Sequence, residues 1–300
     1  MPAEFCAHHR EQLSRVVGFS LAGKTRHQRH GDHRRGHAQR HGFLHRPAAF
    51  AGVGHRRRDP VQILVLLQDL GAQVEFDDRV KIIVPWITEN QAQVPVTADA
   101  RAVPEVVKMI VFADLNPIQH VLTLTPAKAA PYVSFRMKVE QATPVRAAAL
   151  TSDGVWHVGG VYLDASGGGC SANAMARGDA GWTETRGQTQ AKLWREVDGM
   201  TRARLRVRHP MDTGLAKDNT PAYYIERMDM RGATGEPLAT IEMFEPVSED
   251  PTLTLLLRLP ATDATLELEG RDNNGGIYKS SIPAPGRHSA LPRTQTTGQA

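Results

Sequence analysis

The chain has 300 residues, of which 41% are hydrophobic and 23% charged, and this composition is typical of a soluble globular protein of about two domains. Its formal net charge is only +4, and its longest apolar run, residues 61–67, is far shorter than the ~20 residues of a membrane-spanning helix. With only Cys6 and Cys170, the sequence offers no disulfide framework and no cysteine-rich metal site, so we expect neither a bridge nor a bound metal.

The first segment, residues 1–60, differs in composition from the rest of the chain. Residues 1–58 hold 12 of the 36 Lys and Arg residues, 9 of the 13 His residues and only 3 of the 32 Asp and Glu residues. No amphipathic period is present, so we expect this His/Arg-rich segment to be disordered or mistranslated from a wrong start. A metal-buffering tail and a nucleic-acid-binding arm are the alternatives. No signal peptide is readable at the start.

Residues 70–172 are predicted to form a β-sandwich. Short segments that mostly alternate apolar and polar residues are separated by turn signals such as Asn116-Pro117 and Asp153-Gly154. Repeated short strands of this kind are typical of a sandwich. The predicted strands cover residues 80–84, 106–112, 120–124, 133–139, 145–150 and 156–163.

A second sandwich is predicted over residues 201–285. Residues 173–200 read as a linker with at most one helical turn, near residues 191–197. Asn274-Gly275 marks a tight hairpin turn between the last two strands, because it readily supplies positive φ values. Residues 286–300 read as a disordered tail. The predicted strands cover residues 203–208, 222–230, 238–245, 252–259, 265–269 and 277–282. The fold class is therefore all-β, with two sandwiches joined by a linker.

Cys170 directly follows three glycines at the junction between these sandwiches. Glycine accepts φ of either sign, so we expect Gly167 to Gly169 to form a mobile arm that presents the thiol to solvent. The nearest charge in the sequence is Asp164, and no neighbouring group is placed to stabilise a thiolate. This pattern favours a carrier thiol over a catalytic one. An ordinary flexible loop with an incidental cysteine is the alternative.

Two blocks of the sequence, residues 107–170 and residues 206–282, carry the patterns of known families. Residues 107–170 resemble SoxY, the sulfur-carrier subunit of the thiosulfate-oxidising Sox system, in residues 114–117, 131–137, 141–145, 153–154 and the glycine-cysteine arm. Residues 206–282 resemble SoxZ, most specifically in residues 209–218 and again in residues 245–251. The resemblance spans about residues 74–285. Its order is similar to that of fused SoxYZ-like carriers associated with quinoprotein dehydrogenases.

The resemblance implies a periplasmic carrier rather than an enzyme, built of two immunoglobulin-like sandwiches. It implies that Cys170 is the covalent attachment site for thiosulfate-type intermediates and that Gly167, Gly168 and Gly169 form the hinge of the arm. No cofactor, nucleic acid or membrane span is implied. The partners would be periplasmic enzymes of the Sox type or enzymes associated with a quinoprotein dehydrogenase. A non-covalent periplasmic scaffold with an incidental cysteine is the alternative function.

The chain departs from the family pattern at the arm. In SoxY the arm is a free C-terminal end and two glycines follow its cysteine, whereas here Ser171-Ala172 follow and the chain continues. About 30 linker residues could extend ~100 Å in contour, so we expect the arm to retain its reach. The export signal of the family is also missing from this sequence.

Other polar and aromatic residues have ordinary structural interpretations beside functional ones. His209 could be a metal ligand, but a loop or capping histidine is the favoured interpretation. Trp182 and Trp194 could anchor a partner protein, although packing against a sandwich is favoured. A set of acidic residues could suggest calcium, but their spacing matches no calcium-loop pattern and we expect solvated turn residues: Asp212, Asp218, Glu249 and Asp250.

Overall fold

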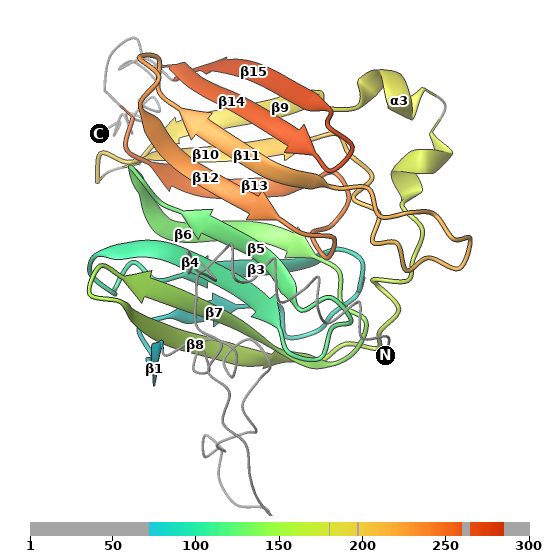
Figure 1. Ribbon diagram of the computed structural model, residues 1–300, viewed down its shortest axis with the longest axis horizontal. Helices are drawn as coiled ribbons and strands as arrows, with labels where there is room; N and C mark the ends of the chain where they lie inside the picture. The colour runs from blue at the N-terminus through green and yellow to red at the C-terminus, as the bar shows by residue number, and fades with distance from the viewer. Residues whose placement is uncertain (1–71, 180, 197, 260–264, 285–300) are drawn as a thin grey trace, which may run out of the picture. The chain divides into compact units, whose positions relative to one another are not determined.

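The computed structural model describes residues 72–179, 181–196, 198–259 and 265–284. Over these residues the fold is all-β, as predicted, with two sheets and short helical turns at Met175–Gly178 and Trp182–Thr185 (α3) (Figure 1). The predicted segment 1–60, the predicted tail 286–300 and Cys6 lie outside the described residues. No helix of the described part is both long enough and apolar enough to cross a membrane.

One sheet has nine strands, in the order β1-β8-β7-β4-β5-β12-β11-β14-β15. Its neighbours pair antiparallel except at the edge, where β1 runs parallel to β8. Because β7 and β8 flank each other along their whole length, the end of β8 and the arm that follows it leave from a well-paired part of the sheet. The strands are β1 (Gln73–Phe76), β4 (Val106–Ala113), β5 (His120–Thr125), β7 (Thr143–Thr151), β8 (Val155–Leu163), β11 (Ile225–Arg231), β12 (Pro237–Met243), β14 (Thr265–Asp272) and β15 (Ile277–Pro283).

The other sheet has six strands, in the order β2-β3-β6-β13-β10-β9. Strand β10 alternates strictly between buried and exposed positions, as expected of a strand with one face on a core and one face in water. The strands are β2 (Lys81–Ile83), β3 (Val94–Asp99), β6 (Ala129–Met137), β9 (Thr189–Arg195), β10 (Thr201–Val207) and β13 (Thr252–Leu257).

Both sheets run through the N-terminal and the C-terminal half of the described chain. Strand β5 pairs with β12 in one sheet, and β6 pairs with β13 in the other (Figure 1). A single cluster of buried apolar side chains extends across both halves, from Val80 to Leu268. The two predicted sandwiches are therefore joined edge to edge by backbone pairing, and not only by the connecting segment.

Three details of the sequence-based strand assignment were incomplete or wrong. Strands β1 and β3 were not predicted, and Pro95 within β3 is a residue that argues against a strand. The expected helical turn near residues 191–197 is instead strand β9, which pairs with β10 along its full length. The predicted hairpin is confirmed: Gly275 has a φ of 85°, and its N–H donates to the Asp272 carbonyl over 3.0 Å.

We expect the two halves to unfold in one cooperative transition. Ile241 of β12 lies opposite Leu124 of β5 at the junction, and both side chains are fully buried. Replacing Ile241 with valine should lower the free energy of unfolding of the whole described fold by about 1 kcal/mol, because it leaves a small cavity. Urea denaturation followed by tryptophan fluorescence and by far-UV circular dichroism would measure this change. The neighbouring Glu242→Ala variant is the control, and two separate transitions with only one shifted would contradict the expectation.

Candidate functional site

The glycine arm is held along the segment that follows β6. The Gly168 N–H donates to the Glu140 carbonyl over 3.2 Å, and the Gly169 N–H donates to the Val139 carbonyl over 2.9 Å. A Cβ on Gly169 would lie 2.1 Å from the Gln91 carbonyl oxygen, and Gly167 has a φ of 97°. These glycines are therefore required for close backbone approach and for a left-handed turn. A hinge role for Gly167, Gly168 and Gly169 stays a prediction.

Cys170 is buried, with 1% of its surface exposed. Its N–H donates to Glu140 Oε2 over 3.0 Å, and its carbonyl accepts a hydrogen bond of 2.6 Å from Thr213 Oγ1. Ser171 adds two bonds to the same carboxylate, from its N–H at 3.1 Å and from its Oγ at 3.0 Å. The expectation of a thiol presented to solvent is therefore wrong for this structure, because the arm is docked between Glu140 of the N-terminal half and Thr213 of the C-terminal half.

Lys138 is a buried cation beside the docked cysteine. Its side chain is 4% exposed, and its ammonium donates to the Met211 carbonyl. Burial lowers the pKa of Lys138 to about 8, although the nearby Cys170 and Asp212 partly oppose that shift. In the sequence the nearest charge to the thiol is Asp164, but the fold also brings Lys138 and Glu140, from the segment that follows β6, to Cys170.

These surroundings keep the docked thiol protonated. Burial raises the pKa of Cys170 to about 12, the Glu140 carboxylate adds to this rise, and the Lys138 ammonium opposes it. Because the thiolate is the nucleophile, a thiol with this pKa is almost unreactive at neutral pH. The docked arm therefore buries the Cys170 sulfur and disfavours its thiolate form.

Residues 209–213, which we call the clasp, carry Thr213 to the cysteine. The clasp follows β10 and is fixed at its start by the His209 N–H, which donates to Asp250 Oδ1 over 3.0 Å. Met211 has a φ of 50°, and its N–H donates to His209 Nδ1 over 3.1 Å. Asp212 accepts a bond of 2.8 Å from Arg177 Nε. The clasp thus positions the Met211 carbonyl against Lys138 and the Thr213 hydroxyl against Cys170.

His209 has the role of a buried loop histidine. It is 1% exposed, and burial lowers its pKa to about 3, so the ring is neutral. Its Nδ1 accepts the Met211 N–H, while the ring stacks at a tilt on Tyr223 with 4.5 Å between centroids. Within the described ranges no group of three or more His, Cys, Asp or Glu side chains is arranged to hold a metal ion.

The contacts described for the other residues singled out in the sequence do not include Cys170. Asp250 is paired with Arg206 and Arg208, and Asp218 Oδ1 accepts the Thr220 N–H over 3.0 Å. The Trp182 ring lies 5.0 Å from the Arg177 guanidinium carbon, and Trp194 lies on β9. These contacts give Asp218 and Asp250 ordinary structural roles in turns and ion pairs.

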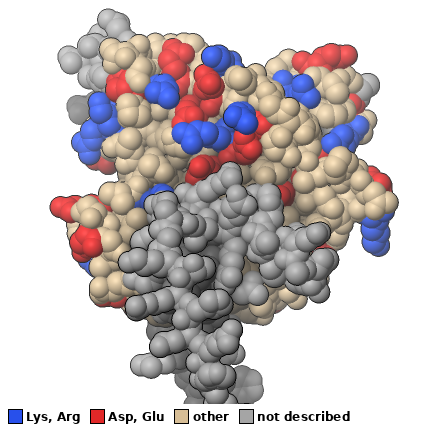
Figure 2. Space-filling model, viewed as in Figure 1, with Lys and Arg blue, Asp and Glu red and all other residues tan. Residues whose placement is uncertain are grey.

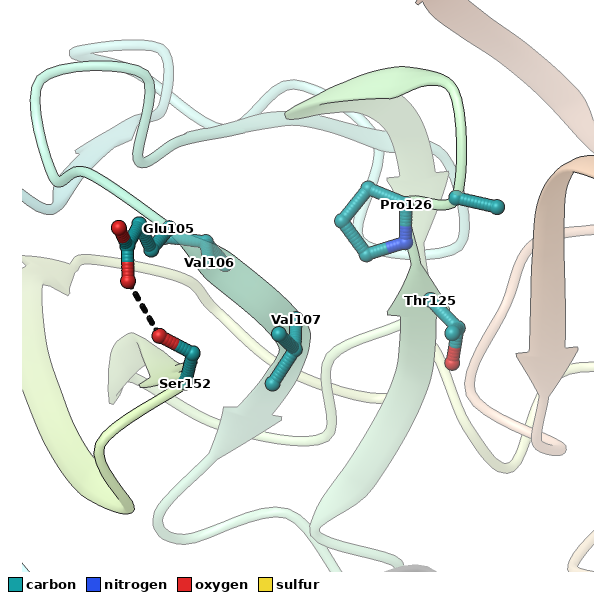
Figure 3. Close-up of a pocket in the computed structure, with 7 residues that line it drawn as sticks. Glu105, Val106, Val107, Thr125, Pro126 and Ser152 are labelled. Atoms are coloured by element: carbon teal, nitrogen blue, oxygen red, sulfur yellow. Dashed lines mark hydrogen bonds between the residues drawn. The ribbon is translucent and has the colours of Figure 1, made fainter.

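A shallow pocket lies on the N-terminal half and shares no lining residue with the Cys170 site. It is lined by the beginning of β4, the end of β5 and the turn after β7 (Figure 3). The Ser152 hydroxyl donates to the Glu105 carboxylate on one side, and Thr125 and Pro126 lie across from them. Because the Glu105 carboxylate already accepts a hydrogen bond from Ser152, the remaining surface of the pocket is mainly apolar.

Comparisons with solved structures list proteins of low similarity. The sulfur carrier protein SoxY from Chlorobium limicola f thiosulfatophilum is 21% identical over 33% of this chain and 91% of its own, with a TM-score of 0.30. A beta-glycosidase from Bacteroides vulgatus is 11% identical over 69% of this chain and 25% of its own, with a TM-score of 0.20. No curated protein matches the sequence. None of these likenesses carries a functional argument.

Two sequence families match the chain in succession. The family described as Sulfur oxidation protein SoxY matches residues 66–170, and the family described as Sulphur oxidation protein SoxZ matches residues 189–283. The SoxY match ends at Cys170, and the SoxZ match begins at the first residue of β9. Together the matches span two thirds of the chain. The chain is a sulfur oxidation protein of the SoxYZ type, in which a SoxY domain precedes a SoxZ domain in one polypeptide.

Proposed function

We propose that this protein carries thiosulfate-type sulfur intermediates covalently on Cys170 and presents them to periplasmic partner enzymes. The observation that supports this most is the way in which the arm is docked. Its polar side-chain contacts go to one carboxylate, Glu140, and one hydroxyl, Thr213, so the arm can leave without disrupting the sheets. Docking protects an idle thiol, and release exposes it for loading.

The loading step requires a two-electron oxidant. The Cys170 thiol and thiosulfate join through a new S–S bond, the thiol proton is released, and two electrons pass to a partner oxidoreductase. A Sox-type enzyme or one associated with a quinoprotein dehydrogenase would accept them. Hydrolysis by a further partner then releases sulfate and leaves a persulfide on Cys170. A partner oxidoreductase must remove six electrons from the outer sulfur, with water as the oxygen source, before a second hydrolysis releases sulfate and regenerates the thiol. In this proposal the carrier supplies only the attachment point and its movement.

Tetrathionate provides a direct test without a partner, because it already contains an oxidised S–S bond. Attack by the Cys170 thiolate on a central sulfur forms the protein thiosulfonate and releases thiosulfate. We expect intact-protein mass spectrometry to find this adduct in the Cys6→Ser variant, which leaves only Cys170, and not in the Cys6→Ser/Cys170→Ser variant. Absence of the adduct from Cys6→Ser, under conditions where free cysteine is fully modified, would contradict the proposal.

The burial of Cys170 favours one second candidate, a non-covalent scaffold in which the cysteine is incidental. The two functions differ in the phenotype of a single substitution. A carrier should lose sulfur oxidation in a Cys170→Ser strain, whereas a scaffold should retain it and lose it only when surface residues of the sheets are changed.

A further inference from the structure

The outer face of β9 and β10 is strongly basic. Strand β10 buries Ala203 and Leu205 in the core and turns Arg202, Arg204 and Arg206 outward into solvent. The neighbouring strand β9 exposes Lys192 toward the same face, since the register pairs it with Arg204. Strands β9, β10 and β13 contain no acidic residue at all.

Like charges are placed directly opposite each other on this face. Lys192 is the cross-strand partner of Arg204, and Trp194 is the partner of Arg202. The Trp194 ring contacts two cations, with the Lys192 Nζ at 5.1 Å and the Arg202 guanidinium carbon at 4.7 Å from its centroid. Directly opposed like charges destabilise a sheet. The fold alone therefore does not explain why this pair is present.

The centre of this face lacks a counter-ion. Arg202 pairs with Glu196 at 3.0 Å and Arg206 with Asp250 at 2.7 Å, both at the ends of the row. Between them, Lys192 and Arg204 have no ion pair with any carboxylate of the described residues. The nine-stranded sheet differs, because basic and acidic side chains alternate on its outer face over the C-terminal half (Figure 2).

We propose that the basic face, defined as Lys192, Trp194, Arg202, Arg204 and Arg206, docks an acidic surface of the partner enzyme that loads Cys170. This inference rests on the proposed carrier function. Exposed cations without a counter-ion match an acidic protein surface and steer its approach. Tryptophan and arginine are also the residue types that most often dominate binding energy at protein interfaces.

The basic face is connected to the docked arm by the chain itself. Strand β10 continues directly into the clasp, and Asp250 binds Arg206 and Arg208 while it also accepts the His209 N–H. Thr213, at the end of the clasp, holds the Cys170 carbonyl. A partner bound to the basic face therefore contacts the strand that leads directly into the clasp and, through Thr213, to Cys170.

The test compares two double variants of the full chain that remove charge without adding any. Lys192→Gln/Arg204→Gln relieves the opposed pair and should fold at least as stably as the wild type. Arg227→Gln/Arg271→Gln is the matched control on the other sheet. The rate of thiosulfate-dependent adduct formation on Cys170 is followed by mass spectrometry in a soluble extract of the source organism that lacks this protein. We expect the first variant to load about tenfold more slowly at low salt and the control to load at the wild-type rate.

Defined probes separate the possible occupants of the face. Poly-L-glutamate should inhibit loading of the wild type and have little effect on the Lys192→Gln/Arg204→Gln variant. Equal loading rates for all three proteins would overturn the inference, as would preferential binding of short single-stranded DNA at physiological salt or self-association through this face. Tetrathionate labelling of Cys170 should be the same in all three. Its failure in the wild type would count against the carrier function itself rather than against the basic face.

Discussion

Replacing Glu140 with alanine is expected to increase the rate of Cys170 labelling by the thiol reagent dithiobis(nitrobenzoate) about thirtyfold. The Glu140 carboxylate accepts hydrogen bonds from the N–H groups of Cys170 and Ser171 and from the Ser171 hydroxyl. Losing hydrogen bonds to a charged acceptor costs about 2 kcal/mol of docking free energy, which corresponds to about thirtyfold in the undocked population. Since the docked thiol is buried, labelling follows that population when opening and closing are fast.

Loss of the hydrogen bond from Thr213 of the clasp to Cys170 should also increase the labelling rate, but by less. Thr213→Val removes the single bond to the Cys170 carbonyl, and we expect about a tenfold increase. All measurements use the Cys6→Ser background so that Cys170 is the reacting thiol. Glu89→Ala removes an exposed carboxylate elsewhere and should leave the rate unchanged. Unaltered labelling in both the Glu140 and Thr213 variants would show that these residues do not hold the arm.

Lys138→Met is expected to be more stable than its parent at pH 7 and to lose that advantage as the pH rises to 10. The Lys138 pKa falls from 10.5 to about 8 on folding, because its charge is buried. Below pH 8 the folded and the unfolded chain both carry the charge, and the folded chain bears its full desolvation cost. Between pH 8 and 10.5 the folded chain has lost a proton that the unfolded chain keeps, so stability rises with pH. The difference between parent and variant should therefore change by about 2–3 kcal/mol.

The measurement is urea denaturation of both proteins in the Cys170→Ser background at several pH values. This background is needed because the folded thiol has a pKa of about 12 and the unfolded thiol one near 9.0, so Cys170 contributes a stability that falls with pH above 9. Lys279→Met, an exposed lysine paired with Glu269, is the control and should show no such pH dependence. A parent–variant difference that is constant with pH would contradict the buried-cation interpretation.

The sequence was sufficient to predict the fold class, but not the surroundings of Cys170. The alternation of apolar and polar residues within strands such as β10 is a local pattern, so it can be recognised in the sequence. The docking of the arm depends on contacts over long sequence separations: 30 residues from Cys170 to Glu140 and 43 to Thr213. Three glycines in a row indicate an arm that can move, and also one that can lie against another backbone. The structure shows the second arrangement, at Gly169.

The burial of Lys138 is a second feature that depends on contacts distant in the sequence. In the sequence it is one lysine in an apolar-polar alternating stretch, where a solvated side chain is the ordinary expectation. It is buried because the clasp of the C-terminal half covers it, and the signal for the clasp was a family resemblance over residues 209–218 rather than a physical pattern. The basic face is different, since the alternating arginines at 202, 204 and 206 are visible in the sequence. Only the register with β9 shows that Lys192 lies opposite Arg204.

The pairing of β5 with β12 and of β6 with β13 has a consequence for how the carrier behaves on dilution. The arm and its Glu140 contact belong to one half, and the clasp belongs to the other, yet both are parts of one covalent chain with continuous sheets. The clasp is therefore present at a fixed effective concentration relative to the arm, whatever the amount of protein in the compartment. In a carrier made of two separable subunits, the protected state of the thiol would decline as the subunits dissociate. Here the fraction of molecules with a docked arm does not depend on the protein concentration.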